Sequence, residues 1–464
     1  MNPDSFRKHA HEFVDWIADY FETIEQYPVK SRVQPGEIKQ QIPGHAPKSG
    51  EPIEAIFHDF QTIIMPGISH WQHPGWFAYF PANNSPVSVL AEMLTAGLGV
   101  QGMIWDTSPA ATELEEVVTS WLRDMMGLSP DFTGVIQDTA STATLCALLS
   151  AREKTTGFSV NKKGFEQTLR VYTSNQTHSS IEKGVKIAGF GKENLVYIES
   201  DENFALKADQ LEKAIKADLE NGFVPCCVIA TLGTTSSMAM DPAKDMAAIC
   251  KKYGIWLHVD AAFAGTAAIV PELRGFMEGS DLADSFVFNP HKWMLTNFDC
   301  SVYYVKDPEV LKQTFSIMPE YLKTAADNQV NNYRDWGIQL GRRFRSLKLW
   351  FVIRHYGIEG IQQMVRRHVE LARKFASWIQ DEPRFEILAP VNLSLVCFRM
   401  VKPGLSPEEL NELNKKLLEY INQSGEVYLT HTILNGNYCL RLSVGQRNTE
   451  KRHVKRVFEL CEGF

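Results

Sequence analysis

The sequence predicts an α/β protein whose mostly parallel central sheet is covered by helices on both faces. Three observations support this fold class. From about residue 87, short apolar runs with strand character alternate with longer runs of helical period. Such alternation implies βαβ units, in which helices connect parallel strands and cover the sheet. The two ends differ, because residues 1–86 indicate a helix and an extended arm, and residues 366–464 indicate a small α+β domain.

Length and charge limit the class of protein. The 464 residues are enough for a large core and more than one domain. A net charge of −8 gives no sign of a nucleic-acid-binding surface. The sequence shows no signal peptide, no apolar stretch as long as a membrane span and no metal-ligand spacing among its histidines. Its eight cysteines include no C-x-x-C pair, which suits reduced thiols in a cytoplasmic protein.

The first 86 residues are expected to form a helix and a dimerisation arm. Apolar residues from Phe6 to Ile24 recur three or four positions apart, which predicts a helix over residues 4–27. Five prolines within residues 28–52 favour an extended arm with little core of its own. Such a helix and arm need a surface to pack on. A second copy of the chain would supply one, so we expect a homodimer.

An aromatic loop is expected at residues 70–86. It holds five aromatic residues among prolines and a glycine, with neither helix nor strand period. A loop this apolar is expected to lie against another surface or to line a cavity. A wedge beneath a domain interface and the lining of a ligand pocket both fit it.

A large domain is expected over residues 87–365. Its predicted strands cover 133–137, 169–173, 194–198, 224–232, 254–260, 284–288 and 300–305. Its predicted helices cover 87–98, 112–126, 141–154, 207–220, 243–253 and 342–356. Residues 318–332 have no apolar period and indicate a surface loop. Loops of that length inside a compact domain are usually functional or disordered.

The small domain is expected over residues 366–464, with its start inside a predicted helix at 360–380. Strands are expected at 385–388 and 393–400, and a helix at 406–423. A hairpin is expected over 426–444 and a last helix after 449. A capping box opens the 406–423 helix at Ser406. The pair Asn435-Gly436 between two apolar runs is a strong hairpin signal.

Lys292 stands at the end of a predicted strand. The apolar run Ser285–Phe288 stops at Asn289-Pro290, because proline has no N–H to continue a ladder. His291 and Lys292 therefore fall at the carboxyl end of the strand, where open α/β sheets bind ligands. A desolvated lysine there favours its neutral amine, which can form a Schiff base with a carbonyl, including that of pyridoxal phosphate (PLP). An exposed lysine after a turn explains the same residues.

Asp260 ends the preceding strand. The run Ile255–Val259 is mostly apolar, and a carboxylate at its end needs a partner or exposure to water. The protonated pyridine nitrogen of PLP is such a partner, and the small Ala261 and Ala262 leave room for a flat ring. A buried aspartate that caps a neighbouring loop is the alternative.

Further candidate groups fall at the same predicted edge. A helix is expected to begin at the segment Asp138-Thr-Ala-Ser-Thr142, so Ala140 and Ser141 could hold a phosphate at its N-terminus. An ordinary helix cap explains the same residues. Thr235 and His178 each follow another predicted strand. The imidazole could stack on a cofactor ring or move protons, or it could belong to a loop near a helix start.

Four motifs together resemble the group II PLP-dependent decarboxylases, and among them the aromatic-L-amino-acid decarboxylase family. They are Asn289-Pro-His-Lys292, His258-Val-Asp-Ala-Ala262, Thr177-His-Ser-Ser180 and Gly341-Arg-Arg-Phe-Arg-Ser-Leu-Lys348. The resemblance covers nearly the whole chain. It implies the PLP-dependent transferase fold of the aspartate aminotransferase type (type I), PLP as cofactor, and a homodimer that decarboxylates aromatic amino acids to arylalkylamines and CO2.

The resemblance also implies a role for each matching residue. Lys292 would bind PLP as a Schiff base, and Asp260 would pair with the pyridine nitrogen. His178 would stack over the ring, with Ala262 beneath it. The phosphate would be held, and the covalent link surrounded, by Ala140, Ser141, Thr235, Asn289 and His291. The substrate side chain would be bound by Trp71, Tyr79, Phe80, Pro81, Gln101, Met103 and Gly341. Residues near 101–104 would come from the other subunit.

Two positions bear on the reaction and the substrate. Tyr321 matches the loop tyrosine that protonates the α-carbon after CO2 leaves, where phenylalanine goes with oxidative deamination to an aldehyde. Gly341 matches a position at which glycine in plant relatives goes with indolic substrates, which favours tryptophan or a broad aromatic range. Two residues depart from the family pattern beside the phosphate site. Asp138 replaces the usual glycine, and Thr142 replaces a frequent glutamate.

Three hypotheses follow. The first is an aromatic amino acid decarboxylase. The second keeps PLP but is an aldehyde synthase or a decarboxylase of a non-aromatic amino acid; the aromatic lining at 71–80 argues against acidic substrates. The third is a binding or scaffold protein on the same fold. Such a protein would be expected to have lost Lys292 or Asp260, and both are present.

Overall fold

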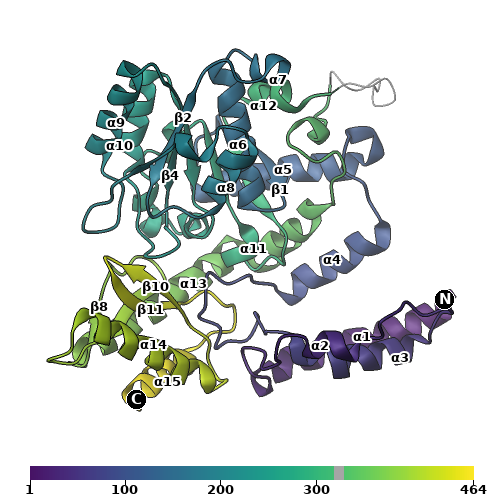
Figure 1. Ribbon diagram of the computed structural model, residues 1–464. Coiled ribbons are helices and arrows are strands. Elements are labelled where there is room, and N and C mark those ends of the chain that lie inside the picture. Colours follow the sequence, from purple (N-terminus) through teal and green to yellow (C-terminus); the bar gives the residue numbers. More distant parts are fainter. Residues whose placement is uncertain (318–328) are drawn as a thin grey trace.

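A seven-stranded sheet forms the centre of the larger part of the molecule (Figure 1). The computed structural model describes residues 1–317 and 329–464. The strand order is β1-β7-β6-β5-β4-β2-β3. The strands are β1 (Thr133–Gln137), β2 (Leu169–Ser174), β3 (Leu195–Ile198), β4 (Val224–Thr231), β5 (Trp256–Asp260), β6 (Ser285–Phe288) and β7 (Ser301–Val305). Strand β7 runs antiparallel to both neighbours, and the other adjacent pairs are parallel. The predicted, mostly parallel sheet is confirmed.

Helices cover both faces of this sheet. The helices of this larger part are α4 (Pro86–Leu98), α5 (Pro109–Met126), α6 (Ala140–Thr155), α7 (Val160–Lys163), α8 (Ser180–Ile187), α9 (Ala208–Glu220), α10 (Ala243–Tyr253), α11 (Pro290–Trp293) and α12 (Pro308–Phe315). One core packs α5, α9 and α10 on the sheet through residues such as Leu122, Ile215 and Met246. A second core packs α6 and α8 on the opposite face. Apolar residues on both sides of each strand explain why these strands are continuous apolar runs.

Several short helices were not predicted. The clearest is α12, which follows β7 closely. The Asp307 side chain caps it by accepting a hydrogen bond from the Glu309 N–H, and Pro308 occupies its first position. This signal was present in the sequence, but eight residues are too few for the helical period to stand out.

The N-terminal arm is helical and projects from the rest of the molecule (Figure 1). It contains α1 (Pro3–Thr23), α2 (Glu37–Gln41) and α3 (Ile53–Asp59), the last continuing into short turns to Gly67. The prediction of α1 is confirmed. Within residues 28–52, predicted to be extended, the structure adds the five-residue helix α2, and α3 begins just after this segment. Helix α1 packs on the α3 segment through aromatic rings, with centroids 4.5 Å apart for Phe13 and Phe57 and 5.2 Å apart for Trp16 and Phe60.

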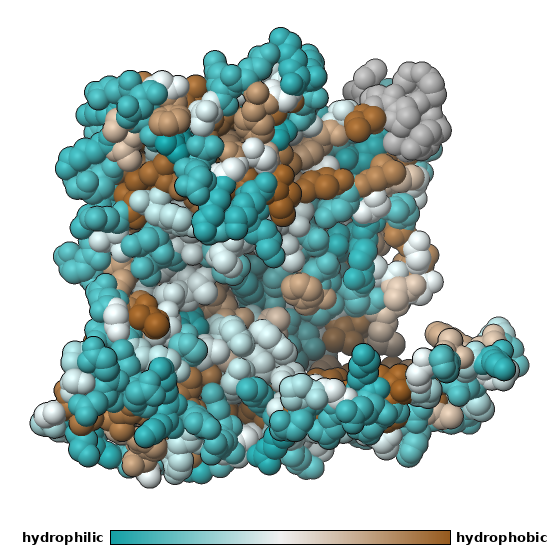
Figure 2. All heavy atoms as spheres, viewed as in Figure 1, coloured by the Kyte–Doolittle hydropathy of each residue, from teal (hydrophilic) through white to brown (hydrophobic). Residues whose placement is uncertain are grey.

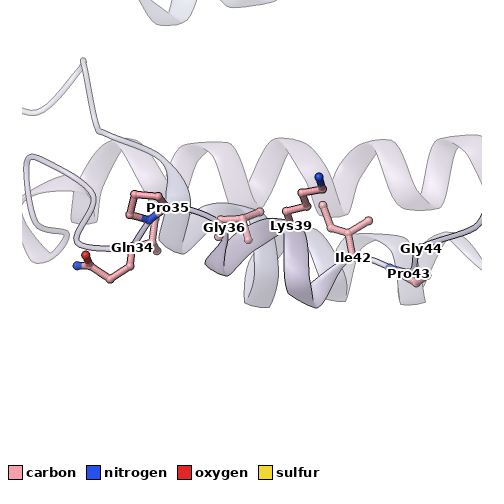
Figure 3. Close-up of a pocket in the computed structure, with 9 residues that line it drawn as sticks. Gln34, Pro35, Gly36, Lys39, Ile42, Pro43 and Gly44 are labelled. Carbon is pink, nitrogen blue, oxygen red and sulfur yellow. The ribbon is translucent and has the colours of Figure 1, made fainter.

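The arm carries an open hollow around α2 (Figure 3). Its volume is about 770 Å³, and its lining comes from the single segment between Val33 and Gly44, including Ile38 and Ile42. Figure 2 shows hydrophobic atoms where the arm and the body face each other. None of the residues that line the hollow is a predicted site residue, so we treat it as a feature of the arm.

A four-stranded antiparallel sheet forms the small C-terminal part. Its order is β10-β11-β9-β8, with β8 (Phe385–Ile387), β9 (Leu395–Met400), β10 (Thr430–Leu434) and β11 (Asn437–Ser443). Its helices are α14 (Pro407–Gln423) and α15 (Lys451–Glu462). The predicted hairpin turn is confirmed, since Asn435 and Gly436 have φ values of 49° and 82°. Both residues need positive φ in the turn that matches the strand twist.

Helix α13 (Arg345–Asp381) connects the large and small parts (Figure 1). The two helices predicted here are joined, with a non-helical Gly357 (φ 65°) at the bend between them. Helix α13 passes through residue 365, and the domain boundary there stays a prediction. No helix in residues 1–317 or 329–464 is both long and apolar enough to cross a membrane.

Candidate active site

A cavity of about 230 Å³ lies at the carboxyl ends of β4, β5 and β6. Parallel strands bring their carboxyl ends to one edge of the sheet, and the side chains that follow them meet there. The cavity lining includes all nine residues predicted to contact the cofactor, which are Ala140, Ser141, His178, Thr235, Asp260, Ala262, Asn289, His291 and Lys292. The sequence motifs, which are spread over more than a hundred positions, therefore form one site.

Lys292 provides an amine to this cavity. Its short helix, α11, begins at Pro290, and the Lys292 N–H donates to the Asn289 carbonyl at 2.9 Å. Burial lowers the pKa of Lys292, and the negative charge of Asp260 opposes this effect. The Nζ atom lies 5.7 Å from the centre of the Phe80 ring. A lysine with a lowered pKa has more of its amine neutral at a given pH, as Schiff-base chemistry requires.

Asp260 places a carboxylate opposite that amine. It is the last residue of β5 and is only 5% exposed. Its Oδ1 accepts a hydrogen bond from the Ala262 N–H at 2.9 Å, which fixes the carboxylate against the cavity. The main chain of Ala262 continues the link, because its carbonyl accepts from the Asn289 N–H at 3.0 Å. Asp260 and the turn that carries Lys292 are thus connected by hydrogen bonds at adjacent strand ends.

His178 contributes a neutral imidazole. Its Nδ1 accepts a hydrogen bond from the Ser180 N–H at 3.2 Å and is 2.8 Å from the Ser180 hydroxyl. An acceptor nitrogen carries no proton, so the ring proton belongs on Nε2. Burial and then the charge of Lys292 lower the pKa of His178. The ring can therefore stack on an aromatic surface and donate from Nε2.

The N-terminus of α6 supplies an anion site. Thr139 caps the helix, its Oγ1 accepting a hydrogen bond from the Thr142 N–H at 3.4 Å, and Thr139, Ala140 and Ser141 line the cavity. Free N–H groups and the helix dipole favour a phosphate at this position. Asp138 lies beside it, where its carboxylate accepts from the Thr139 N–H at 2.6 Å. An amine, a carboxylate and a helix N-terminus in one cavity match the three polar parts of PLP, so the residues fit this cofactor.

Two buried side chains support the turn before Lys292. The Asn289 side-chain oxygen accepts a hydrogen bond from the Ser301 hydroxyl. His291 Nδ1 accepts from the Cys300 N–H at 3.0 Å. Burial, with a smaller effect of Lys292, lowers the pKa of His291 to about 3, so its imidazole is neutral. Both side chains tie the turn to the start of β7.

Asn83 supports the turn that carries His291 and Lys292, and the sequence did not reveal it. It is 1% exposed, and its N–H donates to the His291 carbonyl at 2.9 Å. Its side-chain amide donates to the carbonyls of Lys292 at 2.7 Å and Gly445 at 2.6 Å. These partners lie 209 and 362 positions away along the chain, so no local pattern could have revealed them.

A stack of aromatic rings was also missed. Phe80 lies on Phe263 with ring centres 4.2 Å apart, and Phe263 lies on Trp293 at 4.5 Å. The Trp293 indole donates to His368 of α13 at 2.8 Å. Phe263 lines the cavity beside Ala262, and the sequence signal was simply an aromatic residue three positions after a strand end.

The predicted substrate residues do not all reach this cavity. Phe80 lines it, whereas Trp71, Tyr79, Pro81, Gln101, Met103 and Gly341 are not part of its lining. Trp71 and Tyr79 stack on each other with ring centres 5.9 Å apart. Gln101 lies beside Gly341, and its side-chain oxygen accepts from the Arg342 N–H at 2.6 Å. The roles of these residues stay predictions, and Tyr321 lies outside the described residues.

Comparison with known proteins identifies the family. Residues 35–401 match the model of the pyridoxal-dependent decarboxylase conserved domain. The chain is 44% identical over its full length to phenylacetaldehyde synthase of Arabidopsis thaliana, of which it covers 96%. It is equally identical to tyrosine decarboxylase 4 of Petroselinum crispum, of which it covers 93%.

A solved structure extends the match to the fold. Tryptophan decarboxylase of Catharanthus roseus, crystallised with L-tryptophan, superposes with a TM-score of 0.94 at 42% identity, covering all of this chain and 98% of that one. The predicted fold and PLP dependence are confirmed. The chain therefore belongs to the pyridoxal-dependent decarboxylases, and within them to the aromatic amino acid decarboxylase family.

Proposed function

We propose that this enzyme decarboxylates aromatic L-amino acids, with tryptophan favoured, to the corresponding arylalkylamine and CO2. One observation carries the proposal. The Lys292 amine, with its lowered pKa, and the Asp260 carboxylate line the same small cavity, and the Phe80 ring lies beside the amine. Those are the groups that PLP chemistry on an aromatic substrate needs.

The residues that would hold PLP follow from the cavity. Lys292 would bind it covalently, Asp260 would pair with the ring nitrogen, and the N-terminus of α6 would receive the phosphate. Bound PLP supplies an electron sink for the electron pair released when the bond between the α-carbon and the carboxylate breaks. A carboxylate paired with the ring nitrogen would favour the protonated ring.

The protein groups orient the substrate and move protons. His178 lines the cavity and carries its ring proton on Nε2, so it can stack and donate without carrying charge. The Lys292 amine can take up and return a proton, because its lowered pKa brings it closer to neutral pH. We assign the protonation of the substrate α-carbon to Tyr321.

A homodimer would complete the substrate pocket. Gln101, Met103 and Gly341 lie apart from the cavity of their own chain, as expected if they serve the partner's cavity. Helix α4 exposes a row of large apolar side chains, with exposed fractions of 53% for Leu90 and 65% for Leu98. Exposed apolar surface of this kind marks a protein interface. Together with the arm, it supports the expected dimer.

We expect the enzyme to work in the cytoplasm. All eight cysteines are buried and unpaired within the described chain. Buried thiols of this kind suit a reducing compartment. Fractionation followed by detection of the protein would test this expectation, and recovery from a membrane or secreted fraction would contradict it.

A substrate panel tests the reaction. We would incubate the holoenzyme with tryptophan, tyrosine, phenylalanine and DOPA and measure amine, aldehyde, peroxide and CO2. Amine and CO2 in equal amounts, without peroxide, are expected. The similarity to a phenylacetaldehyde synthase supports one alternative, an aldehyde synthase, which would release peroxide in proportion to product. In the proposed decarboxylase, Tyr321→Phe should raise the aldehyde fraction of the product. An unchanged amine yield would show that Tyr321 has another role.

A further inference from the structure

We propose that Arg441 is a positioning residue that holds two segments of the cavity wall in place. Its buried guanidinium, on β11 of the small domain, joins the Thr235–Ser236 turn to the Tyr79–Phe80 loop. The inference rests on the proposed function, because it assigns these two segments to the substrate side of the site.

The first contact is with the turn after β4. The Arg441 Nη2 donates to the Thr235 carbonyl at 2.6 Å, and its Nε donates to the Ser236 carbonyl at 3.1 Å. Arg441 is 3% exposed, so water does not compete for these bonds. Thr235 lines the cavity, and the position of its main chain is therefore set by a residue of the other domain.

The second contact is with the aromatic loop. The Arg441 Nη1 donates to the Thr430 hydroxyl at 3.1 Å, and the same hydroxyl accepts from the Tyr79 N–H at 3.3 Å. The guanidinium carbon lies 5.4 Å from the centre of the Phe80 ring. A guanidinium at this distance attracts the ring face. Arg441 thus holds Phe80 directly and Tyr79 through Thr430.

The neighbouring side chains of the small sheet reinforce the same turn. The Cys397 thiol of β9 donates to the Ser236 carbonyl at 3.3 Å. The Thr432 hydroxyl of β10 donates to the Ser236 hydroxyl at 3.0 Å. Three adjacent strands therefore clamp one turn of the large domain, with Arg441 between them.

A purely structural role would not need a charge here. No carboxylate in the described part of the chain forms an ion pair with Arg441; its partners are carbonyl and hydroxyl oxygens and a ring. Burial lowers the pKa of Arg441, and the nearby thiols of Cys397 and Cys439 oppose this effect. Burying a cation without a carboxylate is costly, and an apolar residue of similar size would pack at lower cost. The planar fork of donors, which reaches three oxygens at once, is what arginine adds.

The chain offers a matched control in the same sheet. Arg399 of β9 is also largely buried, and it bonds Glu386 at 2.6 Å and Asn437 at 2.7 Å. Neither partner belongs to the turn or to the aromatic loop. Arg399→Lys therefore makes the same chemical change in the same domain without touching the cavity wall.

The test compares Arg441→Lys and Arg441→Met with Arg399→Lys as PLP-loaded enzymes. We expect Arg441→Lys to raise the KM for tryptophan about tenfold with a smaller change in kcat, because one ammonium cannot bond all three oxygens. The visible absorbance of bound PLP should be retained. Amide hydrogen exchange of segments 75–80 and 233–238 should become faster, and Arg399→Lys should change neither quantity.

The outcomes separate the two proposals. If Arg441→Lys matches the wild type in KM and in the exchange of both segments, the positioning role is wrong. If exchange increases throughout the small domain in Arg441→Lys and Arg441→Met, Arg441 is only a structural residue and the inference is likewise overturned. If the wild type decarboxylates none of the aromatic amino acids, the proposed function fails. The exchange measurement still decides the role of Arg441 in that case, because it does not depend on turnover.

Discussion

The side-chain amide of Asn83 donates a hydrogen bond to the main-chain oxygen of Lys292, with the two atoms 2.7 Å apart. The same nitrogen donates to the Gly445 carbonyl, and the Asn83 side-chain oxygen accepts from the Arg447 N–H at 2.9 Å. One buried amide thus links the aromatic loop, the turn that carries Lys292 and the small C-terminal part. Every polar group of that side chain is used, so its removal should affect both stability and the site.

Asn83→Ala should lower the free energy of unfolding by about 2–4 kcal/mol, because two buried carbonyls and one N–H lose their partner. Asn83→Asp should also destabilise, since a carboxylate would face two carbonyl oxygens. Urea unfolding of the holoenzyme, followed together with the absorbance of bound PLP, measures both effects. Asn84→Ala is the control, because the buried Asn84 side-chain oxygen has no hydrogen-bond partner among the described residues. Equal losses for Asn83→Ala and Asn84→Ala would contradict this assignment.

Lys292→Ala and Asp260→Asn test the two poles of the cofactor site. Lys292→Ala should abolish the visible absorbance of covalently bound PLP and lower kcat at least about a thousandfold. Asp260→Asn should keep the covalent link but lower kcat about a hundredfold or more, because the ring nitrogen loses its counter-charge. Spectra and single-turnover rates separate the two effects. A Lys292→Ala enzyme with the wild-type spectrum would place the covalent link elsewhere.

The pH dependence of stability should reflect three buried histidines, His258, His291 and His368. Burial lowers the pKa of each to about 3 in the folded protein, whereas the ordinary value is about 6.5. Between these values the unfolded chain binds more protons than the folded one. Stability should therefore fall as the pH drops below about 6.5, by about 1.4 kcal/mol per pH unit for each histidine. Above pH 6.5 these histidines should add no further stability.

His368→Gln isolates one of these contributions. A glutamine oxygen can still accept the hydrogen bond from the Trp293 indole, but the side chain takes up no proton on unfolding. Urea unfolding at pH 7.5, 6 and 5 gives the slope of stability against pH. This slope should be smaller than in the wild type by the contribution of about one proton. Identical slopes for the two proteins would show that His368 is protonated in the folded state.

Asp138→Asn should strengthen PLP binding. The carboxylate lies beside the N-terminus of α6, where it would repel the cofactor phosphate. Asparagine keeps the oxygen that accepts from the Thr139 N–H and removes the charge. We expect the Kd of PLP for the apoenzyme to fall about five- to tenfold at low salt, and less at high salt. A titration followed by absorbance measures this change, and a Kd that is unchanged at low salt would contradict it.

Gly341→Ser should shift the substrate preference toward phenolic amino acids. A Cβ at Gly341 would lie 3.1 Å from Gln101 Nε2, so Gln101 must move, and its bond to the Arg342 N–H would be disturbed. We expect kcat/KM for tryptophan to fall about tenfold relative to tyrosine, as the space for the larger ring is reduced. Gly275→Ser is a control, because nothing lies within 4 Å of a Cβ at that glycine. The same tryptophan-to-tyrosine ratio in all three proteins would rule out this role.

The central sheet and the residues that line the cavity at its strand ends could be predicted because their signals are local. Lys292 and Asp260 each follow a short apolar run, and the run itself marks the strand end at which ligands bind. Asn83 and Arg441 could not be predicted in the same way. Their importance comes from hydrogen bonds to residues 209 and 206 positions away, which no period or motif records.

The aromatic loop shows where sequence and tertiary structure divide. The sequence by itself determined the order of strands and helices, the polar groups at the strand ends and the family, because periodicity and motifs are properties of neighbouring residues. Only the tertiary structure decided that Phe80 faces the cavity while Trp71 and Tyr79 stack outside its lining. It also decided that Arg441 is buried without a carboxylate and that the Lys292 amine is desolvated. Burial and its effect on charge depend on which distant segments pack together, and the chain acquires those contacts only when it folds.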